Sequence, residues 1–382
     1  MSHDGRWVVF DVEGREGDVG IRHRNQGIWH ANRDGQRWKV GTPEGNRGHH
    51  PDISADGQWI VYVTDARLSP QDNNYVEDVY VWRARDTYHN SLELISCGIR
   101  GGAGDGQVYG PARISADGRY VAWTSHATNY VDIGGDPDGP VGSIFVRDRT
   151  FGRTSRIPVT PAYEGAGTHI EKIDFQFTEE GQFQVAFETA AALVRDDTNG
   201  KKDVYVVTAD PGVFTLGGNR HAFRQHSPEH AGDKALWSVE LVSVGPNGAL
   251  GDADSYGAHI LQPSTSRAAA EFGGRPLVVF TSNARTLSTR EGDLDSDVFV
   301  QAFDASWTGL GPLPPRQLTS NLSPQEKSRC TAGDAENLAS GDIGIAMTCR
   351  GPLVREDVNH IADVYVQTLA GAPVLALSII HI

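Results

Sequence analysis

The chain has 382 residues, with 34 basic and 49 acidic side chains, and a net charge of -15. So few Lys and Arg residues argue against a nucleic-acid-binding protein, because phosphate backbones need clustered basic side chains. No apolar run approaches the roughly 18 residues of a membrane span, and no basic segment followed by an apolar core opens the chain, so neither a membrane helix nor a signal peptide is predicted.

A unit of four short strands recurs along the chain, and its third copy is the clearest. Residues 111–125 read PARISADGRYVAWTS, which is an apolar run, an Asp-Gly turn and a run rich in β-formers. Asp-Gly between such runs predicts a hairpin, because Gly tolerates a positive φ. Further strands are predicted at residues 144–146 and near residues 155–157. One small sheet cannot bury both of its faces, so repeated sheets must pack on one another.

Six copies follow one another, and no stretch between them shows a helical period. The first copy has almost nothing before its turn, so its blade either has three strands or is completed by residues upstream. The sequence therefore predicts an all-β chain that forms a single domain, a six-bladed β-propeller with four-stranded antiparallel blades and an incomplete first blade. The predicted blades are residues 1–46, 47–98, 107–160, 165–245, 256–320 and 327–382.

Two segments, residues 51–64 and 111–125, and the D-V-Y-V or D-V-F-V tetrads at positions 78, 203, 297 and 363 carry a resemblance to a known family. This pattern resembles the TolB-type β-propeller repeat, a WD40-like repeat also called PD40. Members of that family are mostly bacterial and often exported, and they act as protein-binding scaffolds or as propellers attached to enzymes. The resemblance implies the bacterial periplasm or secretion. It is specific for architecture, since one fold hosts many functions.

In the family topology, one face around the mouth of the central channel carries the links between blades. Several His, Tyr and Arg side chains around such a funnel could bind a ligand, or act as acid, base and anion clamp. Each of them taken singly is equally explained as an ordinary polar surface residue. The predicted ligand-binding residues are His49, His50, Tyr109, His169, Tyr256, His259 and Arg329.

The loops between second and third strands share an Asp-x-Asn-x-x-x-Asp pattern. Alternating oxygen ligands beside a Gly suit a hard cation such as Ca²⁺, so Asp197, Asn199 and Asp203 are predicted metal ligands, and calcium is the one cofactor for which the sequence offers a site. The alternative is structural, because Asx side chains cap their own turns and the last Asp can fix the start of the third strand. The same spacing occurs at Asp72, Asn74 and Asp78, and at Asp357, Asn359 and Asp363.

The three cysteines, Cys97, Cys330 and Cys349, fit no zinc pattern. Cys330 precedes the first strand of the sixth copy and Cys349 ends its second strand. Because these ends meet in an antiparallel hairpin, a disulfide is geometrically possible. Two half-buried thiols are the alternative.

No nucleophile elbow and no P-loop is present in the sequence. We therefore expect a monomeric, non-catalytic binding module that uses the funnel face to hold a protein, peptide, carbohydrate or small molecule. One alternative is a stand-alone propeller enzyme that performs acid–base or metal-assisted chemistry on a small molecule at the channel mouth. Another is a spacer from a larger surface protein.

Overall fold

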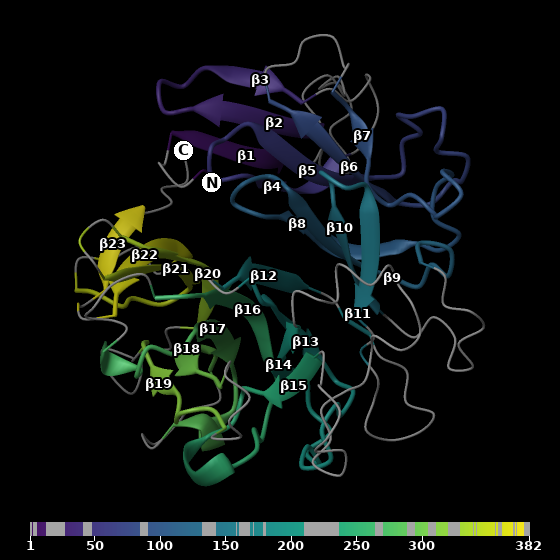
Figure 1. The fold of residues 1–382 in the computed structure, drawn as a ribbon. Helices are drawn as coiled ribbons and strands as arrows, with labels where there is room; N and C mark the ends of the chain where they lie inside the picture. The colour runs from purple at the N-terminus through teal and green to yellow at the C-terminus, as the bar shows by residue number, and fades with distance from the viewer. Residues whose placement is uncertain are drawn as a thin grey trace. The chain divides into compact units, whose positions relative to one another are not determined.

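Six antiparallel sheets account for the regular structure of the chain (Figure 1). They fall into two compact units, of which the first holds β1 to β11 and the second holds β12 to β23. The structure is a computed structural model, and it describes residues 2, 6–12, 27–40, 48–84, 91–131, 143–157, 159, 169–170, 172–178, 181–209, 237–263, 270–288, 295–304, 311–319, 329–338, 340, 342–355, 357, 361–369, 371 and 373–377.

The first unit contains three sheets. The first sheet is β1 (Trp7–Val12), β2 (Gly27–Asn32) and β3 (Arg37–Lys39). The second is β4 (Gly48–Ile53), β5 (Trp59–Thr64), β6 (Asp78–Arg83) and β7 (Glu93–Leu94). The third is β8 (Val108–Ile114), β9 (Tyr120–Ser125), β10 (Ser143–Asp148) and β11 (Arg153–Ile157).

The second unit contains three further sheets and two short 3-10 turns, η4 (Pro246–Gly248) and η5 (Arg285–Leu287). The fourth sheet is β12 (Ile173–Phe177), β13 (Phe183–Thr189), β14 (Asp203–Ala209) and β15 (Trp237–Leu241). The fifth is β16 (Ser255–Leu261), β17 (Leu277–Ser282), β18 (Asp297–Ala302) and β19 (Arg316–Gln317). The sixth is β20 (Cys330–Asn337), β21 (Ile343–Cys349), β22 (Asp363–Thr368) and β23 (Val374–Leu377).

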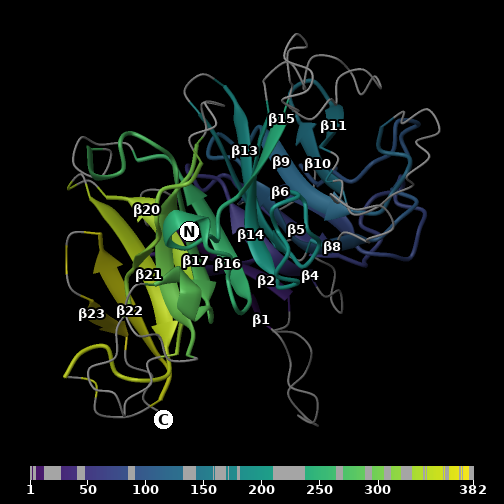
Figure 2. The same ribbon diagram turned by 90° about the horizontal axis from the view of Figure 1, so that it is seen from below.

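Each sheet is a meander in which consecutive strands pair. The fold class is therefore the predicted one, an all-β six-bladed β-propeller, and within the described residues the first blade has three strands. In each unit the first strands of neighbouring blades lie side by side, as β4 and β8 do in the first and β16 and β20 in the second (Figures 1 and 2). The part of the chain that the structure describes holds no helix long and apolar enough to cross a membrane.

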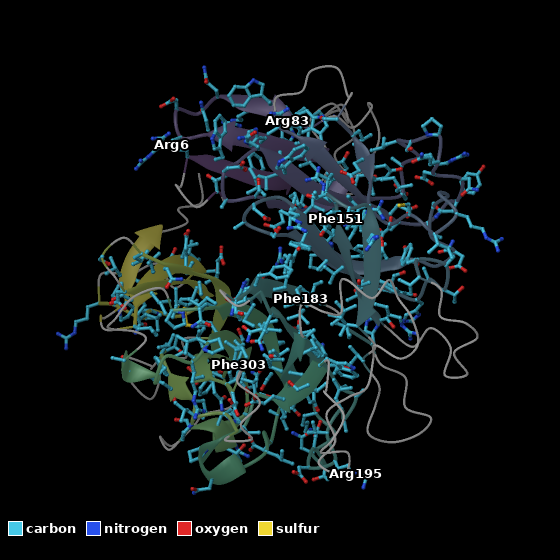
Figure 3. The ribbon with its side chains drawn as sticks, in the orientation of Figure 1. Arg6, Arg83, Phe151, Phe183, Arg195 and Phe303 are labelled. Atoms are coloured by element: carbon cyan, nitrogen blue, oxygen red, sulfur yellow. A yellow bond between two sulfur atoms is a disulfide. The ribbon has the colours of Figure 1, made fainter. Side chains whose placement is uncertain are left out.

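The middle strands of the blades form the core. Every residue of β13, β14 and β17 is buried, so these strands show no alternation between a buried and a solvent-facing side. Phe183 and Phe303 are buried among the sheets of the second unit, whereas Arg195 is exposed at its edge (Figure 3). A fully buried side chain of this size contributes about 2 kcal/mol.

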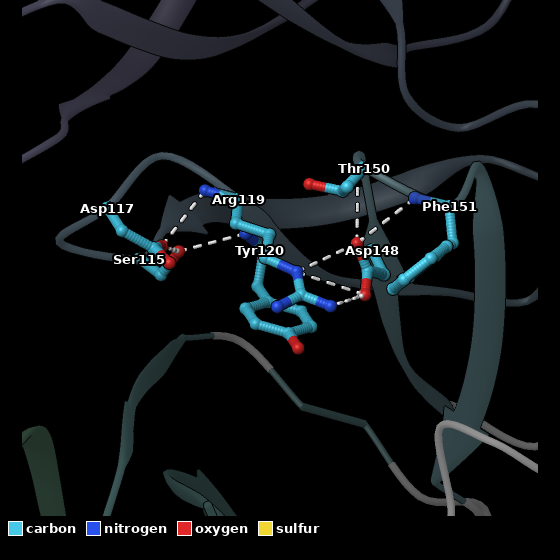
Figure 4. Close-up of polar contacts among 7 residues, drawn as sticks. All are labelled: Ser115, Asp117, Arg119, Tyr120, Asp148, Thr150 and Phe151. Carbon is cyan, nitrogen blue, oxygen red and sulfur yellow. Dashed lines mark hydrogen bonds and ion pairs between the residues drawn. The ribbon is translucent and has the colours of Figure 1, made fainter.

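The Ser-Ala-Asp-Gly turn of the third blade is held by its own side chains (Figure 4). The Ser115 hydroxyl donates to the Asp117 carboxylate over 2.6 Å, and that carboxylate accepts the backbone N–H of Arg119 over 3.0 Å. The Arg119 guanidinium pairs with both carboxylate oxygens of Asp148, the shortest distance being 2.6 Å (Figure 4). The repeated turn sequence is therefore explained by structure alone.

The glycine of this turn also sets the packing between blades. Gly118 has a φ of +69°, and a Cβ added there would lie 2.4 Å from Cδ1 of Trp59 in the preceding blade. Gly57 has the same relation to Trp7, again at 2.4 Å. A side chain at either position would meet both a disfavoured backbone conformation and a tryptophan ring.

A disulfide joins Cys330 to Cys349, whose Cα atoms lie 4.1 Å apart as directly paired residues of β20 and β21. Of the two alternatives for these cysteines, the structure thus supports the disulfide. Cys97, in the first unit, is a free, half-buried thiol.

Candidate functional site

Five blades place an ionisable side chain at the same register position of the first strand. In each blade this residue pairs with a second-strand residue that in turn pairs with a Val of the third strand. Two of these residues belong to the first unit and three to the second, and three of the five are carboxylates. We call this set the first-strand row: Asp52, Arg113, Asp174, His259 and Asp334.

A bulge precedes the row residue in four of these strands, since the register shifts in β4, β8, β16 and β20. In three of them the first bulged residue has a left-handed backbone, with φ values of 52° at His50, 66° at Gly110 and 66° at Gly257. Glycine adopts this conformation freely, and histidine does so only at a cost. His50 is therefore the exception among equivalent positions.

Two carboxylates of the first-strand row tie neighbouring blades together. Asp52 accepts the backbone N–H of Ile114 over 3.0 Å, and Asp174 accepts that of Ile260 over 3.0 Å. Loss of hydration raises the pKa of Asp52, while the Arg113 guanidinium and the backbone N–H groups of Ile114 and Ile53 act to lower it. The row is thus part of the blade packing as well as a polar surface.

The first unit brings two predicted residues into direct contact. Nδ1 of His49 lies 3.1 Å from Nδ1 of His50, and Nε2 of His49 lies 2.8 Å from a carboxylate oxygen of Glu77. The two imidazole rings are nearly perpendicular, at 88°. Loss of hydration and the neighbouring His49 lower the pKa of His50, against the opposing effects of Asp11 and Glu77.

The second unit surrounds His259 with charged groups. Nζ of Lys172 lies 3.1 Å from Nε2 of His259, and Nδ1 faces carboxylate oxygens of Asp174 at 3.6 Å and Asp334 at 3.8 Å. Burial raises the pKa of Glu188. The charge of Lys172 and the backbone N–H groups of the β16 bulge, which donate to Glu188, act to lower that pKa. The cluster is closed except at Asp334, whose side chain is 69% exposed.

The other predicted ligand residues lie near these clusters or in separate contacts. Tyr109 occupies the strand position of His49 in the third blade and packs on His126, with ring centroids 4.6 Å apart. Tyr256 occupies the same position on β16. Nε of Arg329 donates to the buried Asp295 over 3.2 Å, and His169 is exposed. That all seven predicted residues face one funnel stays a prediction.

The predicted metal ligands are bonded to one another and to the protein. Asn199 Nδ2 donates to Asp203 over 2.8 Å and to the carbonyl of Gly251 over 3.1 Å. The hydroxyl of Tyr205 donates to Asp197, and that of Ser243 donates to Asp203 over 2.7 Å. Burial raises the pKa of Asp203 to about 6.

The second blade repeats this arrangement. Tyr80 donates to Asp72 over 2.7 Å, and Ser96 donates to Asp78 over 2.5 Å while accepting the backbone N–H of Val79. Both loops also contain the expected Asx caps, since Asn74 accepts the backbone N–H of Val76 over 3.1 Å and Asn199 accepts that of Lys201 over 2.8 Å. Among the described residues no group of three or more His, Cys, Asp or Glu side chains is arranged to hold a metal. Asn359 lies outside the described residues, and the calcium site at Asp197, Asn199 and Asp203 stays a prediction.

Sequence reasoning missed four row residues, Asp52, Arg113, Asp174 and Asp334, as well as Lys172 and Glu77. The row was readable, because Asp52 and Arg113 each directly precede the Ile-Ser that leads into a Ser-x-Asp-Gly turn. Glu77 directly precedes the D-V-Y-V tetrad, yet nothing in the sequence pairs it with His49, 28 residues away.

Comparison with known proteins gives a likeness of fold only. No family model and no curated protein matches the chain. TolB from Acinetobacter baumannii is 12% identical with a TM-score of 0.41, over 97% of this chain and 65% of its own length. Oligogalacturonate lyase from Vibrio parahaemolyticus is 10% identical with a TM-score of 0.47, over 99% of this chain and 76% of its own length. Alpha-L-arabinofuranosidase from Lactobacillus brevis is 11% identical with a TM-score of 0.35, over 86% of this chain and 93% of its own length.

Proposed function

We propose that this protein is a binding module in which the first strands of the second unit hold a segment of a partner protein rich in Lys and Arg. The observation that carries the proposal is the first-strand row, an ionisable residue at one register position in five blades. Asp52 and Asp174 also tie neighbouring blades together, so the exposed Asp334 is the carboxylate of the row that a partner can reach.

The charge of the chain and of the row favours a basic partner. Three row residues are carboxylates, and the protein carries a net charge of -15. A surface of this sign attracts cationic partners and steers their approach. Asp334 is the exposed carboxylate of the row. Asp52 and Asp174 are occupied by backbone hydrogen bonds from the next blade.

The disulfide supports an exported protein, because such bonds persist in oxidising compartments and are rare in the cytosol. It agrees with the periplasmic or secreted setting that the TolB-type repeat implies. A propeller that is exported and lacks a recognisable catalytic motif fits an interaction role.

The test is fluorescence anisotropy with a labelled octalysine peptide and an octaglutamate peptide. We expect binding of octalysine alone, weakening as salt rises. Asp334→Asn should lower the affinity about threefold, the size of one exposed ion pair. Asp342→Asn is the matched control, because both carboxylates accept the backbone N–H of the next residue over 2.8 Å on the same hairpin.

Equal affinity for the two peptides, or no binding of either, would overturn the proposal. So would an equal loss in Asp334→Asn and Asp342→Asn, since the attraction would then be a property of the whole chain. A carbohydrate or small-molecule partner would leave both peptides unbound.

A further inference from the structure

The contacts of His49 fix where the protons lie in the His49–His50 pair. An ionised Glu77 only accepts hydrogen bonds, so Nε2 of His49 carries the hydrogen of their 2.8 Å contact. In its neutral form His49 then has its lone pair on Nδ1. The 3.1 Å contact between the two Nδ1 atoms consequently has His50 as the donor.

This assignment leaves the lone pair of His50 on Nε2. Within the described residues Nε2 of His50 has no hydrogen-bond partner, and the side chain is exposed. His259 lies on the first strand of the fifth blade, two residues after Gly257, which corresponds to His50. It shows the opposite case. Its Nε2 lone pair accepts from the Lys172 ammonium, which is only a donor. The two histidines therefore differ in reactivity.

The backbone of His50 indicates that its side chain has a task. The residue adopts a φ of 52°, where the corresponding bulge residues Gly110 and Gly257 are glycines. Strained conformations persist at functional sites when the surroundings hold them. A glycine would satisfy the bulge at no cost, so the imidazole is the reason for a histidine here.

The surrounding charges indicate the class of substrate. The electrostatic neighbours of His50 are two carboxylates, Asp11 and Glu77, and two basic groups, His49 and Arg113. The signs are balanced at the ring while the chain carries a net charge of -15, so an uncharged substrate is favoured over an anionic one. Loss of hydration lowers the pKa of His50, which keeps its ring neutral and nucleophilic near pH 7.

We propose that Glu77, His49 and His50 form a proton relay in which Nε2 of His50 is the nucleophile of an acyl-transfer site for uncharged esters. The arrangement of nucleophile, base and orienting carboxylate is the one that activates weak nucleophiles generally. His50 is the catalytic residue, and His49 and Glu77 are positioning residues. This activity is independent of the proposed peptide binding, and it gives the enzymatic alternative a definite site.

The step balances without a further reagent. Nε2 of His50 adds to the acyl carbon and the alcohol leaves as its oxyanion, while the Nδ1 proton of His50 passes to Nδ1 of His49. The imidazolium of His49 then lies against Glu77. Water next adds to the acyl carbon, one of its protons passes to solvent and matches the charge of the released oxyanion, and the C–N bond breaks. His49 returns its proton to Nδ1 of His50, and the carboxylic acid leaves with the other proton of water.

The probe is p-nitrophenyl acetate, an uncharged ester, with release of p-nitrophenolate followed by absorbance. We expect hydrolysis above that of free imidazole at equal concentration, with an acetyl group found on His50 by peptide mass mapping. His50→Gln should lose about 100-fold in rate. His50→Gly should lose as much, and its backbone suits the bulge, so misfolding cannot explain that loss. An acetyl group on another histidine, or wild-type rates in both variants, would overturn the proposal.

The relay is tested by variants of the positioning residues. His49→Gln should lower kcat with little change in KM. Glu77→Gln should shift the acidic limb of the pH profile to lower pH, because Glu77 acts to raise the pKa of His50. His126→Gln, which alters a histidine outside the relay, should keep the wild-type rate. Unshifted pH profiles in Glu77→Gln would remove the relay. Faster reaction of mono-p-nitrophenyl succinate, an anion with the same leaving group, would overturn the substrate class.

Discussion

Each unit carries a histidine on a first strand, and the two differ in what surrounds the ring. In the second unit both nitrogens of His259 face charged partners, Lys172 on one side and two carboxylates on the other. In the first unit His50 faces its neighbour His49 through one nitrogen and solvent through the other. The same residue type on equivalent strands is thus a closed structural cluster in one unit and an open nucleophile in the other. Reactivity follows from the partners of the ring.

The largest expected effect comes from the disulfide, which belongs to the second unit alone. Cys330→Ala with Cys349→Ala should lower the free energy of unfolding by about 3 kcal/mol, because the cross-link limits the unfolded chain. The cluster around His259 would then account for a larger share of the remaining stability of the second unit. Urea unfolding followed by circular dichroism, with and without reductant, measures the effect. Cys97→Ala in the first unit is the control, with a loss of about 1 kcal/mol or less. A wild-type midpoint that reductant does not move would contradict the prediction.

The second effect tests whether the His259 cluster is structural. Lys172→Met should cost about 2 kcal/mol, because the buried Glu188 loses its neighbouring cation and His259 loses a donor. The matched change in the open site is Glu77→Gln, which should cost less than about 1 kcal/mol, since that carboxyl is 31% exposed. Urea midpoints of both variants at pH 7 provide the measurement. Equal losses would mean that the two sites do not differ as closed and open.

The third effect is a pH dependence that both units share. Burial raises the pKa of Asp78 in the first unit and of Asp203 in the second to about 6, from 3.8 in the unfolded chain. The folded state therefore takes up these protons first, so the two groups stabilise it as pH falls from 7 to 5, by about 1 kcal/mol each, which together outweighs the opposing effect of His50, whose pKa is lowered. The carboxyls whose pKa is lowered, Asp148 and Asp252, act only below pH 3.8. Urea midpoints at pH 7, 6 and 5 measure the slope.

Asp78→Asn and Asp203→Asn should each flatten that slope. Stability that decreases from pH 7 to pH 5 in the wild type would contradict the prediction. The same variants test calcium, which requires an ionised carboxylate. If Asp197, Asn199 and Asp203 hold the ion, calcium at pH 7 raises the wild-type midpoint and that of Asp78→Asn, but not that of Asp203→Asn. A midpoint unmoved by calcium leaves the Asx caps as the role of this loop.

The blades were predictable because their signals are local. In the Ser-x-Asp-Gly turn, Asp117 is hydrogen-bonded to residues two positions away on either side, so residues close together in the sequence specify the turn. The disulfide was also within reach, since Cys330 and Cys349 are directly paired in one hairpin. Local sequence thus determined the sheets and their strand order.

The candidate sites depend on contacts between blades, which the repeat does not reveal. Lys172 and His259 are 87 residues apart, and Asp174 and Ile260 are 86 apart. His49 and His50 were predicted as ligand residues because of their place in a link. Their relation to Glu77 requires the bulge in β4, and a histidine there gives no sign of a left-handed backbone. The sequence therefore predicted where to look, while the chemistry needed the structure.

The smallest expected effect measures how much the left-handed backbone of His50 lowers the free energy of unfolding. Replacing His50 by Gly removes a left-handed histidine at a position where Gly257 stands in the second unit, so the free energy of unfolding should rise by about 0.5 kcal/mol. His50→Ala keeps the strain and loses the contact with His49, so it should be destabilising. The pair of variants is compared by urea midpoint and by p-nitrophenyl acetate hydrolysis in one preparation. Gain of stability with loss of hydrolysis in His50→Gly is expected, because the first unit then keeps the bulge and lacks the nucleophile. A His50→Gly variant less stable than the wild type would show that the imidazole holds the strand, and the two units would then be alike.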